Sequence, residues 1–274
     1  MAGISKAYAT IAEGQIHLRR VDATGDQPPL VLLHASPASS LVLEPLLREL
    51  AGKCELIAFD NPCNGQSCAP VLSEPEIDDF ADMLDRACDA LGLDQINLYG
   101  THTGAHIAIA WALARPERVK SLVLDGVALF SQELRDEMIE QYAPPKSPDE
   151  SGSQFHWAWQ YMRDQMIFFP HYRKDADHKR AGGSFDAETL HRLTLDILNN
   201  LETYHLPYLA VFRHNARADL ARLKLPVLVL TGEAGPLDPA SAEIMELVPE
   251  AKLAQGCSTP QTKAAAISEF LEAQ

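Results

Sequence analysis

The sequence predicts an α/β fold in which a mostly parallel sheet is covered by helices on both faces and carries an inserted helical cap. Three observations support this prediction. Short apolar segments typical of buried strands alternate with helical segments along most of the chain. A strand, a sharp glycine turn and a helix follow one another over residues 95–114. An aromatic-rich segment, residues 128–221, interrupts the alternation between two apolar strands.

Each element of the first half can be assigned from its pattern. Strands are apolar and short, and the helix over residues 76–91 is amphipathic, with its apolar side chains on one face. The turn at residues 35–40 also supplies caps for the helix that follows it. In chain order we expect two strands within 7–21 that join near Glu13 and Gly14, a strand at 29–34, a helix at 41–50, a strand at 54–60, a loop at 61–67 and the helix at 76–91.

The segment Leu98–Gly104 is the most informative part of the chain. Gly100 and Gly104 have the spacing of the G-x-S-x-G pattern, in which a strand turns sharply into a helix and presents the central side chain to a pocket. Here the central residue is His102. An imidazole at such a strained position can act as a base, an acid or a nucleophile, but it cannot form the ordinary serine acyl-enzyme.

The remaining elements complete the alternation. We expect a strand at 119–126, a strand at 226–232, a helix at 240–247, a short strand at 251–254 and a closing helix at 259–272. The aromatic-rich insertion follows a core strand, so it lies at the carboxyl edge of the sheet, where open α/β sheets bind ligands. The predicted organisation is therefore a core of residues 1–127 and 222–274 with a helical cap of residues 128–221.

Composition narrows the class of protein. The chain has 274 residues, of which 46% are hydrophobic, enough for one large domain with an insertion. A formal net charge of -15 argues against nucleic acid or an anionic membrane as a partner. The five cysteines include no C-x-x-C pair, which favours reduced thiols in a cytoplasmic protein. We see neither a signal peptide nor an apolar segment approaching the roughly 18 residues of a membrane helix.

Four motifs in order resemble the α/β-hydrolase superfamily, and the chain is identified as a capped member of it. They are the G-T-H-T-G turn, His34-Ala35-Ser36-Pro37 as an H-G-x-P-like turn, residues 60–67 as a D-x-x-G-x-G-x-S-like loop, and Pro116-Glu117-Arg118-Val119 before an apolar strand. The resemblance covers almost all of the chain outside the cap. It implies the α/β-hydrolase fold and a pocket at the tip of the glycine turn.

The resemblance also implies that the usual catalytic triad is absent. The family order is Ser, then Asp or Glu, then His. The corresponding positions here are His102, Gly235 and Thr259, and no histidine follows His214. The oxyanion hole of the family consists of main-chain N–H groups, so it survives these substitutions. The resemblance places its two donors on Thr103 and Ser36.

Several side chains are candidates for the site. Asp125, at the end of a core strand, could orient His102, because some members of the superfamily take their acid from that region; Asp238 is the other acid near the usual position. His34 is a candidate for binding substrate or for supporting the oxyanion turn, whereas we expect His106 to be packed in the core. In the cap the candidates for lining the pocket are Trp157, Tyr161, Arg163, Asp164, Phe169, His171 and Tyr172, with packing of the cap as the alternative for the aromatic side chains.

Three functions are consistent with these residues. The first is a cofactor-free enzyme that acts on a small apolar or aromatic carbonyl compound, by lyase-type C–C cleavage, elimination or atypical hydrolysis, with His102 as base or nucleophile. The second is a non-catalytic pseudo-hydrolase that serves as a small-molecule receptor or scaffold. The third is a cofactor-free dioxygenase. We expect no nucleotide cofactor, since G-x-G-x-x-G does not occur at a strand–helix junction, and no metal, since the later histidines His178, His191, His205 and His214 are scattered without H-x-x-x-H spacing. A homodimer is possible.

Overall fold

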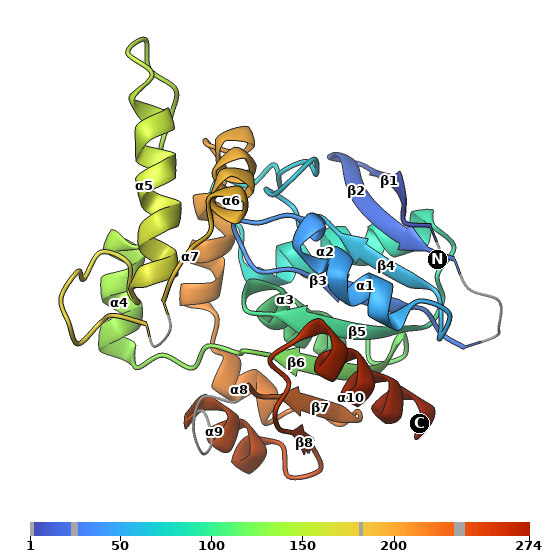
Figure 1. Ribbon diagram of the computed structural model, residues 1–274. Coiled ribbons are helices and arrows are strands. Elements are labelled where there is room, and N and C mark those ends of the chain that lie inside the picture. Colours follow the sequence, from blue (N-terminus) through green and yellow to red (C-terminus); the bar gives the residue numbers. More distant parts are fainter. Residues whose placement is uncertain (1–2, 23–26, 181–182, 233–238) are drawn as a thin grey trace.

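The computed structural model describes residues 3–22, 27–180, 183–232 and 239–274 (Figure 1). Over this part of the chain the strands form one eight-stranded sheet in the order β1-β2-β4-β3-β5-β6-β7-β8. Pairs β1·β2 and β2·β4 are antiparallel, and every pair from β4 to β8 is parallel. The strands are β1 (Ser5–Ile11), β2 (Gly14–Val21), β3 (Leu30–Leu33), β4 (Leu56–Phe59), β5 (Ile96–Thr101), β6 (Val119–Asp125), β7 (Val227–Leu230) and β8 (Lys252–Ala254).

Helices cover both faces of this sheet, which confirms the predicted fold class. Strand β3 illustrates why two cores form, because its side chains alternate between the faces. Val31 and Leu33 join the core beneath α2 and α3, whereas Leu30 and Leu32 join the core beneath α1 and α10. The core helices are α1 (Glu44–Leu50), α2 (Ile77–Ala90), α3 (Thr103–Ala114), α8 (Ala216–Leu220), α9 (Pro239–Leu247) and α10 (Pro260–Glu272).

The helix predicted over residues 41–50 is divided into two parts. Residues Ser40–Leu43 form a 3-10 turn, and the α-helix begins at Glu44. Pro45 lies in the first turn of that α-helix. Proline is tolerated there because the first amides of a helix have no intrahelical acceptor.

The insertion forms a group of helices beside the sheet edge. Its helices are α4 (Gln132–Gln141), α5 (Ser153–Ile167), α6 (Ala187–Asn199) and α7 (His205–Arg213). Helix α5 packs against α6, and α4 packs against α7, which also contacts α2 and α3 of the core. Figure 1 shows these four helices on one side of the sheet, with α4 below α5. Helix α8 lies within the predicted cap range 128–221, but it packs against α3 and α9 of the core.

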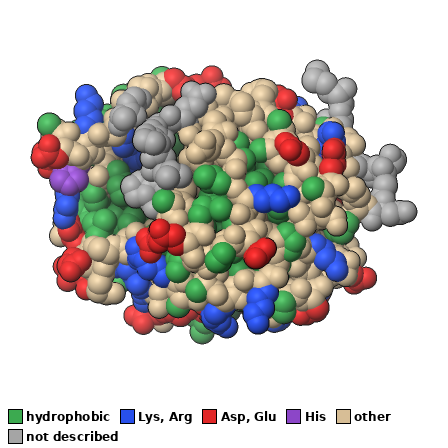
Figure 2. All heavy atoms as spheres, turned by 90° about the horizontal axis from the view of Figure 1, so that it is seen from below, with side chains coloured by type: hydrophobic (Ala, Val, Ile, Leu, Met, Phe, Trp, Pro, Cys, Tyr) green, Lys and Arg blue, Asp and Glu red, His purple; other side chains and the backbone are tan. Residues whose placement is uncertain are grey.

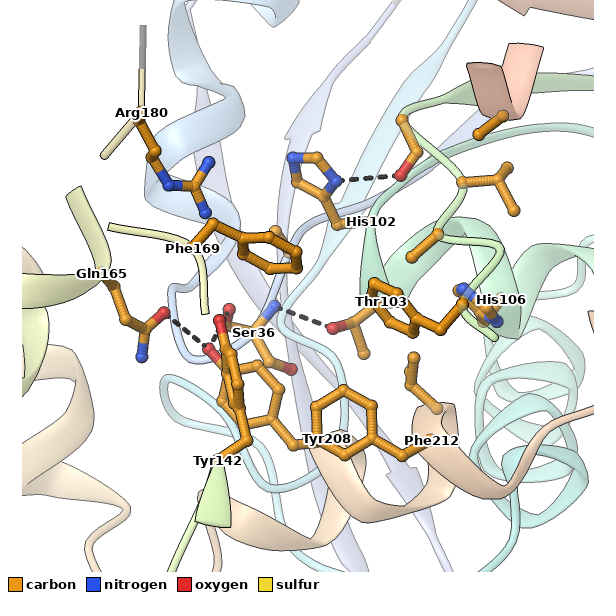
Figure 3. Close-up of a pocket in the computed structure, with 17 residues that line it drawn as sticks. Ser36, His102, Thr103, His106, Tyr142, Gln165, Phe169, Arg180, Tyr208 and Phe212 are labelled. Atoms are coloured by element: carbon orange, nitrogen blue, oxygen red, sulfur yellow. Dashed lines mark hydrogen bonds between the residues drawn. The ribbon is translucent and has the colours of Figure 1, made fainter. Parts of the chain in front are cut away.

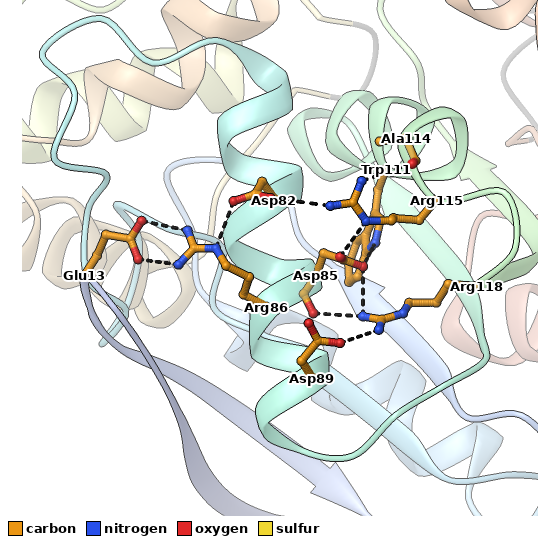
Figure 4. Close-up of polar contacts among 9 residues, drawn as sticks. All are labelled: Glu13, Asp82, Asp85, Arg86, Asp89, Trp111, Ala114, Arg115 and Arg118. Atoms are coloured by element: carbon orange, nitrogen blue, oxygen red, sulfur yellow. Dashed lines mark hydrogen bonds and ion pairs between the residues drawn. The ribbon is translucent and has the colours of Figure 1, made fainter.

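Asp85 ties the helices of one face together (Figure 4). This carboxylate is only 4% exposed and accepts hydrogen bonds from the Trp111 indole, Arg115 Nε and Arg118 Nη1, each at 2.9 Å. A buried carboxylate needs a partner of opposite charge, and Arg115 and Arg118 supply it for Asp85. Arg118 also forms an ion pair with Asp89. The Pro116–Val119 motif therefore has a structural role, which is to join α3 and β6 to α2.

The surface carries charges of both signs. In the face of Figure 2, acidic and basic side chains are interspersed with apolar ones, so the net negative charge is not gathered into one patch there. Among the described residues, no helix combines the length and the apolar character that a membrane crossing requires.

Candidate active site

The turn between β5 and α3 is the strained elbow that the glycine spacing predicts. His102 has φ 49° and ψ -111°, a backbone conformation that residues other than glycine rarely adopt. A Cβ at Gly100 would lie 2.4 Å from the Gly104 carbonyl oxygen, and one at Gly104 would lie 2.3 Å from the Leu33 carbonyl oxygen. Both glycines are therefore required by close packing of the backbone. Strain of this kind costs about 1–3 kcal/mol and is typical of functional positions.

One main-chain carbonyl orients the His102 imidazole. Its Nδ1 lies 2.9 Å from the Gly126 oxygen (Figure 3). A carbonyl oxygen can only accept, so Nδ1 carries a proton, and in the neutral imidazole Nε2 carries the lone pair. The side chain is exposed at the cavity, so Nε2 is available to a ligand. His102 thus has the arrangement of a base or nucleophile whose orienting partner is a peptide group.

Two amides beside His102 can receive negative charge. Thr103 is the first residue of α3, where an N–H has no intrahelical acceptor. The Ser36 N–H donates to Thr103 Oγ1 at 3.3 Å, a long bond that a better acceptor could replace. The Gly104 N–H donates to the His34 oxygen at 3.1 Å and joins the two loops. The main-chain groups assigned to an oxyanion hole therefore lie together at the cavity.

The cavity between the elbow and the inserted helices has a volume of about 480 Å³. One wall is the elbow with Ala35, Ser36 and Gly126, and the other comes from the insertion (Figure 3). The aromatic side chains that line it are Phe130, Tyr142, Phe169, Tyr208 and Phe212. The Tyr208 hydroxyl donates to the Ser36 oxygen at 2.7 Å and lies 3.2 Å from Gln165 Oε1, so the insertion is hydrogen-bonded directly to the turn at residues 34–37.

Arg180 brings a positive charge to this aromatic wall. Its guanidinium carbon lies 5.1 Å from the centre of the Phe169 ring, and its Nε donates to the Phe168 oxygen at 3.3 Å. Within the described residues, Arg180 is the one lining side chain with a permanent charge, and it has no carboxylate partner there. An unpaired guanidinium at a cavity is suited to a carboxylate or phosphate group of a ligand.

Asp125 does not orient His102, and that prediction was wrong. Its Oδ2 accepts hydrogen bonds from the Tyr99 hydroxyl and from Lys263 Nζ, both at 2.5 Å. Tyr99 packs on the face of the sheet covered by α1 and α10, and the Asp125 side chain points to that same face. Only the main chain of Asp125 supports the elbow, since its oxygen accepts the His102 N–H at 3.1 Å.

His34 supports the turn at residues 34–37 but does not line the cavity, so the hypothesis that it binds substrate is not supported. The side chain is fully buried, and its Nδ1 lies 2.9 Å from the Ala35 oxygen. Its Nε2 accepts the Asn61 N–H at 2.9 Å, and the Asn61 amide donates to the His34 oxygen at 2.8 Å. Burial lowers the pKa of His34, which keeps the ring neutral between these partners.

Trp157, Tyr161 and His171 lie behind the cavity wall and do not form it, contrary to the prediction. The rings of Trp157 and Tyr161 stack with centres 4.9 Å apart. The Tyr161 hydroxyl donates to the Tyr142 oxygen at 3.2 Å, and His171 Nε2 lies 2.8 Å from the same oxygen. These side chains therefore hold the backbone of Tyr142, whose ring lines the cavity. Of the cap candidates, Phe169 lines it directly.

The usual histidine position has a structural role here. Thr259 is the N-cap of α10, and its hydroxyl accepts the Thr262 N–H at 3.2 Å. The two candidate acid positions, Gly235 and Asp238, lie outside the described residues. Sequence reasoning missed Tyr142, Gln165, Arg180, Tyr208 and Phe212 as cavity residues. The aromatic content of the insertion was the signal available for three of them.

The chain belongs to the alpha/beta hydrolase fold family, whose model it matches over residues 28–254. It is 27% identical over 126 residues to a proline iminopeptidase of Heyndrickxia coagulans, covering 46% of this chain and 44% of that protein. It is 35% identical over 131 residues to a 2-hydroxy-6-oxononadienedioate/2-hydroxy-6-oxononatrienedioate hydrolase of Pseudomonas putida, covering 44% and 45%. The chain thus spans slightly less than half the length of these curated relatives.

The fold is also similar to that of solved structures over nearly all of the chain. Epoxide hydrolase A from Mycobacterium thermoresistibile superposes with a TM-score of 0.75 at 19% sequence identity, covering 98% of each chain. Similarity at this level of identity concerns the fold alone.

Proposed function

We propose that this chain is a cofactor-free hydrolase that cleaves a small aromatic carbonyl compound bearing an anionic group. One observation supports the chemistry above all others. Because Gly126 engages Nδ1 of His102, a free lone pair on Nε2 stands beside the first amide of α3. A base or nucleophile next to an anion-stabilising amide is the minimum that carbonyl hydrolysis requires.

The reaction can proceed through His102 in two ways. As a base, Nε2 takes a proton from water while the water oxygen adds to the carbonyl carbon, and the proton then passes to the leaving group. As a nucleophile, Nε2 adds to the carbonyl carbon, the bond from that carbon to the leaving group breaks, and the leaving group departs with a proton from water. Water then adds to the resulting acyl-imidazolium, the C–N bond breaks, and the acid and the neutral imidazole are released. In both routes the Thr103 and Ser36 amides stabilise the oxyanion, at about 3 kcal/mol per donor.

The cavity supports the substrate class. Its volume of about 480 Å³ and its aromatic wall suit a small planar compound. Arg180 suits a carboxylate carried by the substrate. The two curated relatives named above carry hydrolase and peptidase names, which agrees with a hydrolytic reaction.

The test uses 4-nitrophenyl esters, with and without a carboxylate, together with β-diketones that report lyase-type cleavage. We expect His102→Ala to lower kcat/KM by on the order of 10²–10⁴-fold. The control is His156→Ala, because His156 is exposed on α5 and lies outside the cavity. Rapid-quench detection of an acyl-imidazole decides between the two routes. If the wild type and His102→Ala bind the probes equally well and neither protein turns them over, the chain is a non-catalytic receptor and the proposed hydrolase function is wrong.

A further inference from the structure

Ser36, in the turn at residues 34–37, is hydrogen-bonded on two sides (Figure 3). On the side of the elbow, its N–H donates to Thr103 Oγ1 at 3.3 Å. On the side of the insertion, its oxygen accepts the Tyr208 hydroxyl of α7 at 2.7 Å. The first hydrogen bond is long and the second has the optimal length for an O–H donor, so the bond to Tyr208 is the stronger of the two.

The Tyr208 side chain is held in place independently of its hydroxyl. The residue is 7% exposed, its ring stacks on that of Phe212 with centres 6.2 Å apart, and the Tyr142 ring centre lies 5.2 Å away. Burial raises the pKa of Tyr208 well above its usual range, so the hydroxyl keeps the proton that it donates. Removal of the hydroxyl alone therefore leaves the ring in place and frees the Ser36 oxygen.

Gln165 of α5 supports the Tyr208 hydroxyl. Its Oε1 lies 3.2 Å from that hydroxyl, and its Nε2 is buried without a hydrogen-bond partner among the described residues. Tyr208 has one proton to donate, and the Ser36 oxygen is the nearer acceptor. A half-turn of the Gln165 amide lets Nε2 donate to the Tyr208 oxygen, which satisfies both side chains. The resulting chain of hydrogen bonds runs from Gln165 through Tyr208 to Ser36.

We propose that Tyr208 is a positioning residue that fixes the Ser36 amide for the transition state of the reaction. This inference rests on the hydrolytic function proposed above, in which the Ser36 N–H stabilises the oxyanion. When the oxyanion forms, it replaces Thr103 Oγ1 as the acceptor of that N–H. The turn does not need to move, because the Ser36 oxygen remains bonded to Tyr208. A donor that is already in position stabilises developing charge without a cost of reorganisation.

This arrangement gives the insertion a task beyond forming one wall of the cavity. Tyr208 lines the cavity, and its hydroxyl bonds to the turn at residues 34–37. Helix α7 also contacts α3, the helix that begins at the elbow. A substrate that packs against the Tyr208 ring therefore contacts the side chain that fixes the Ser36 amide, which links substrate binding to stabilisation of the oxyanion.

Tyr208→Phe removes the hydroxyl, and Tyr204→Phe is the matched control. Tyr204 is also buried in the insertion, its hydroxyl donates to the Pro144 oxygen, and it does not line the cavity. We expect Tyr208→Phe to lower kcat on a neutral 4-nitrophenyl ester roughly 10- to 100-fold and to change KM by less than about twofold. Tyr204→Phe should change neither constant by more than about twofold. Thermal unfolding of both variants verifies that the fold is kept.

Gln165→Met tests the chain of hydrogen bonds. It should lower kcat roughly 3- to 10-fold, the effect of about one hydrogen bond, and should have no further effect when combined with Tyr208→Phe. The reason is that Gln165 acts through the Tyr208 hydroxyl. If the two effects multiply, the chain is overturned. If Tyr208→Phe does not fold, Gln165→Met alone decides the inference, by the same loss of kcat at constant KM.

A binding measurement distinguishes this inference from the proposed function. Trifluoroacetophenone forms in water a tetrahedral diol that resembles the hydrolytic intermediate, whereas acetophenone stays planar. In titration calorimetry, Tyr208→Phe should bind trifluoroacetophenone roughly 10-fold more weakly than the wild type and acetophenone within about twofold of it.

If no ester is turned over but this selective loss is present, the hydrolytic function fails and the role of Tyr208 remains. Equal losses of affinity for both ketones would indicate damaged packing and overturn the inference. Unchanged affinity for both ketones, or an active Tyr208→Phe with the kcat of Tyr204→Phe, overturns it as well.

Discussion

The Nδ1 atom of His102 lies 2.9 Å from the carbonyl oxygen of Gly126. Glycine at position 126 leaves the space that the imidazole occupies, whereas any residue with a Cβ would fill it. A Cβ at position 126 would lie 2.7 Å from His102 Cε1 and 2.8 Å from Nδ1. Gly126 also has φ +76°, which L side chains rarely adopt.

We therefore expect Gly126→Ala to displace the imidazole and to lower kcat by about 10²-fold, since a shift near 1 Å has that effect. The matched control is Gly92→Ala, where φ is +72° and no atom lies within 4 Å of the added Cβ. Both variants should lose about 1 kcal/mol of unfolding free energy from the backbone conformation. Equal activity of the two variants would contradict the role of the Gly126 contact.

Arg180 should determine the preference for charged substrates. Arg180→Gln removes the guanidinium that stands over Phe169, so KM should rise about 10- to 100-fold for an ester that carries a carboxylate. For the neutral ester of the same size, KM should change by less than about twofold, because that ester has no charge for the guanidinium to bind. The control is Arg192→Gln, because Arg192 is exposed on α6 and lies outside this cavity. A uniform rise in KM for both esters would indicate lost packing instead.

Gly104 should be the least replaceable glycine of the elbow. A Cβ at this position would lie 2.3 Å from the Leu33 oxygen and 2.8 Å from Leu33 Cβ, so β3 and α3 would have to separate. We expect Gly104→Ala to cost more than about 4 kcal/mol of unfolding free energy or to prevent folding. Gly232→Ala, where nothing lies within 4 Å, should change stability by less than about 0.5 kcal/mol in urea titrations.

Asp196 on α6 should make the protein less stable as the pH rises. Burial raises the pKa of Asp196 to about 6, and the nearby Asp60 carboxylate adds to this effect, although Ser39 Oγ donates to it at 3.0 Å. In the unfolded chain the pKa of Asp196 returns to near 4. The folded state therefore binds more protons between pH 4 and 6, and its stability decreases across that interval.

The variant Asp196→Asn should not show this decrease in stability. Its free energy of unfolding at pH 7 should exceed that of the wild type by about 2–3 kcal/mol. Near pH 3 the two proteins should have nearly the same free energy of unfolding. Asp94→Asn, at an exposed carboxylate, is the control for loss of one negative charge. Parallel stability curves for wild type and Asp196→Asn from pH 3 to 7 would contradict the prediction.

The fold could be predicted because its determinants are local in the sequence. Alternating and continuous apolar runs locate the strands, and the Gly100–Gly104 spacing locates the elbow with its helix. The strained backbone of His102 follows directly from that spacing. These features depend on residues within a few positions of one another, which is the range over which sequence patterns are informative.

The walls of the cavity could not be predicted in the same way. The aromatic pattern of the insertion indicated a cap, but it did not indicate which face of α5 turns toward the elbow. Tyr161 packs inward, whereas Gln165, one turn later, lines the cavity. His106 and His214 lie 108 positions apart and meet only because α7 returns to α3. Contacts of this kind are set by how helices pack, not by local spacing.

The Gly126 carbonyl and the Thr103 amide belong to the peptide chain itself, so side-chain substitutions other than proline at position 103 leave both groups in place. Substitutions at the tip of the elbow therefore alter which reactive group is present while its acceptor and its anion partner are inherited unchanged. Under the function proposed above, the residue at the tip of the elbow can therefore be exchanged without removing the two main-chain groups beside it.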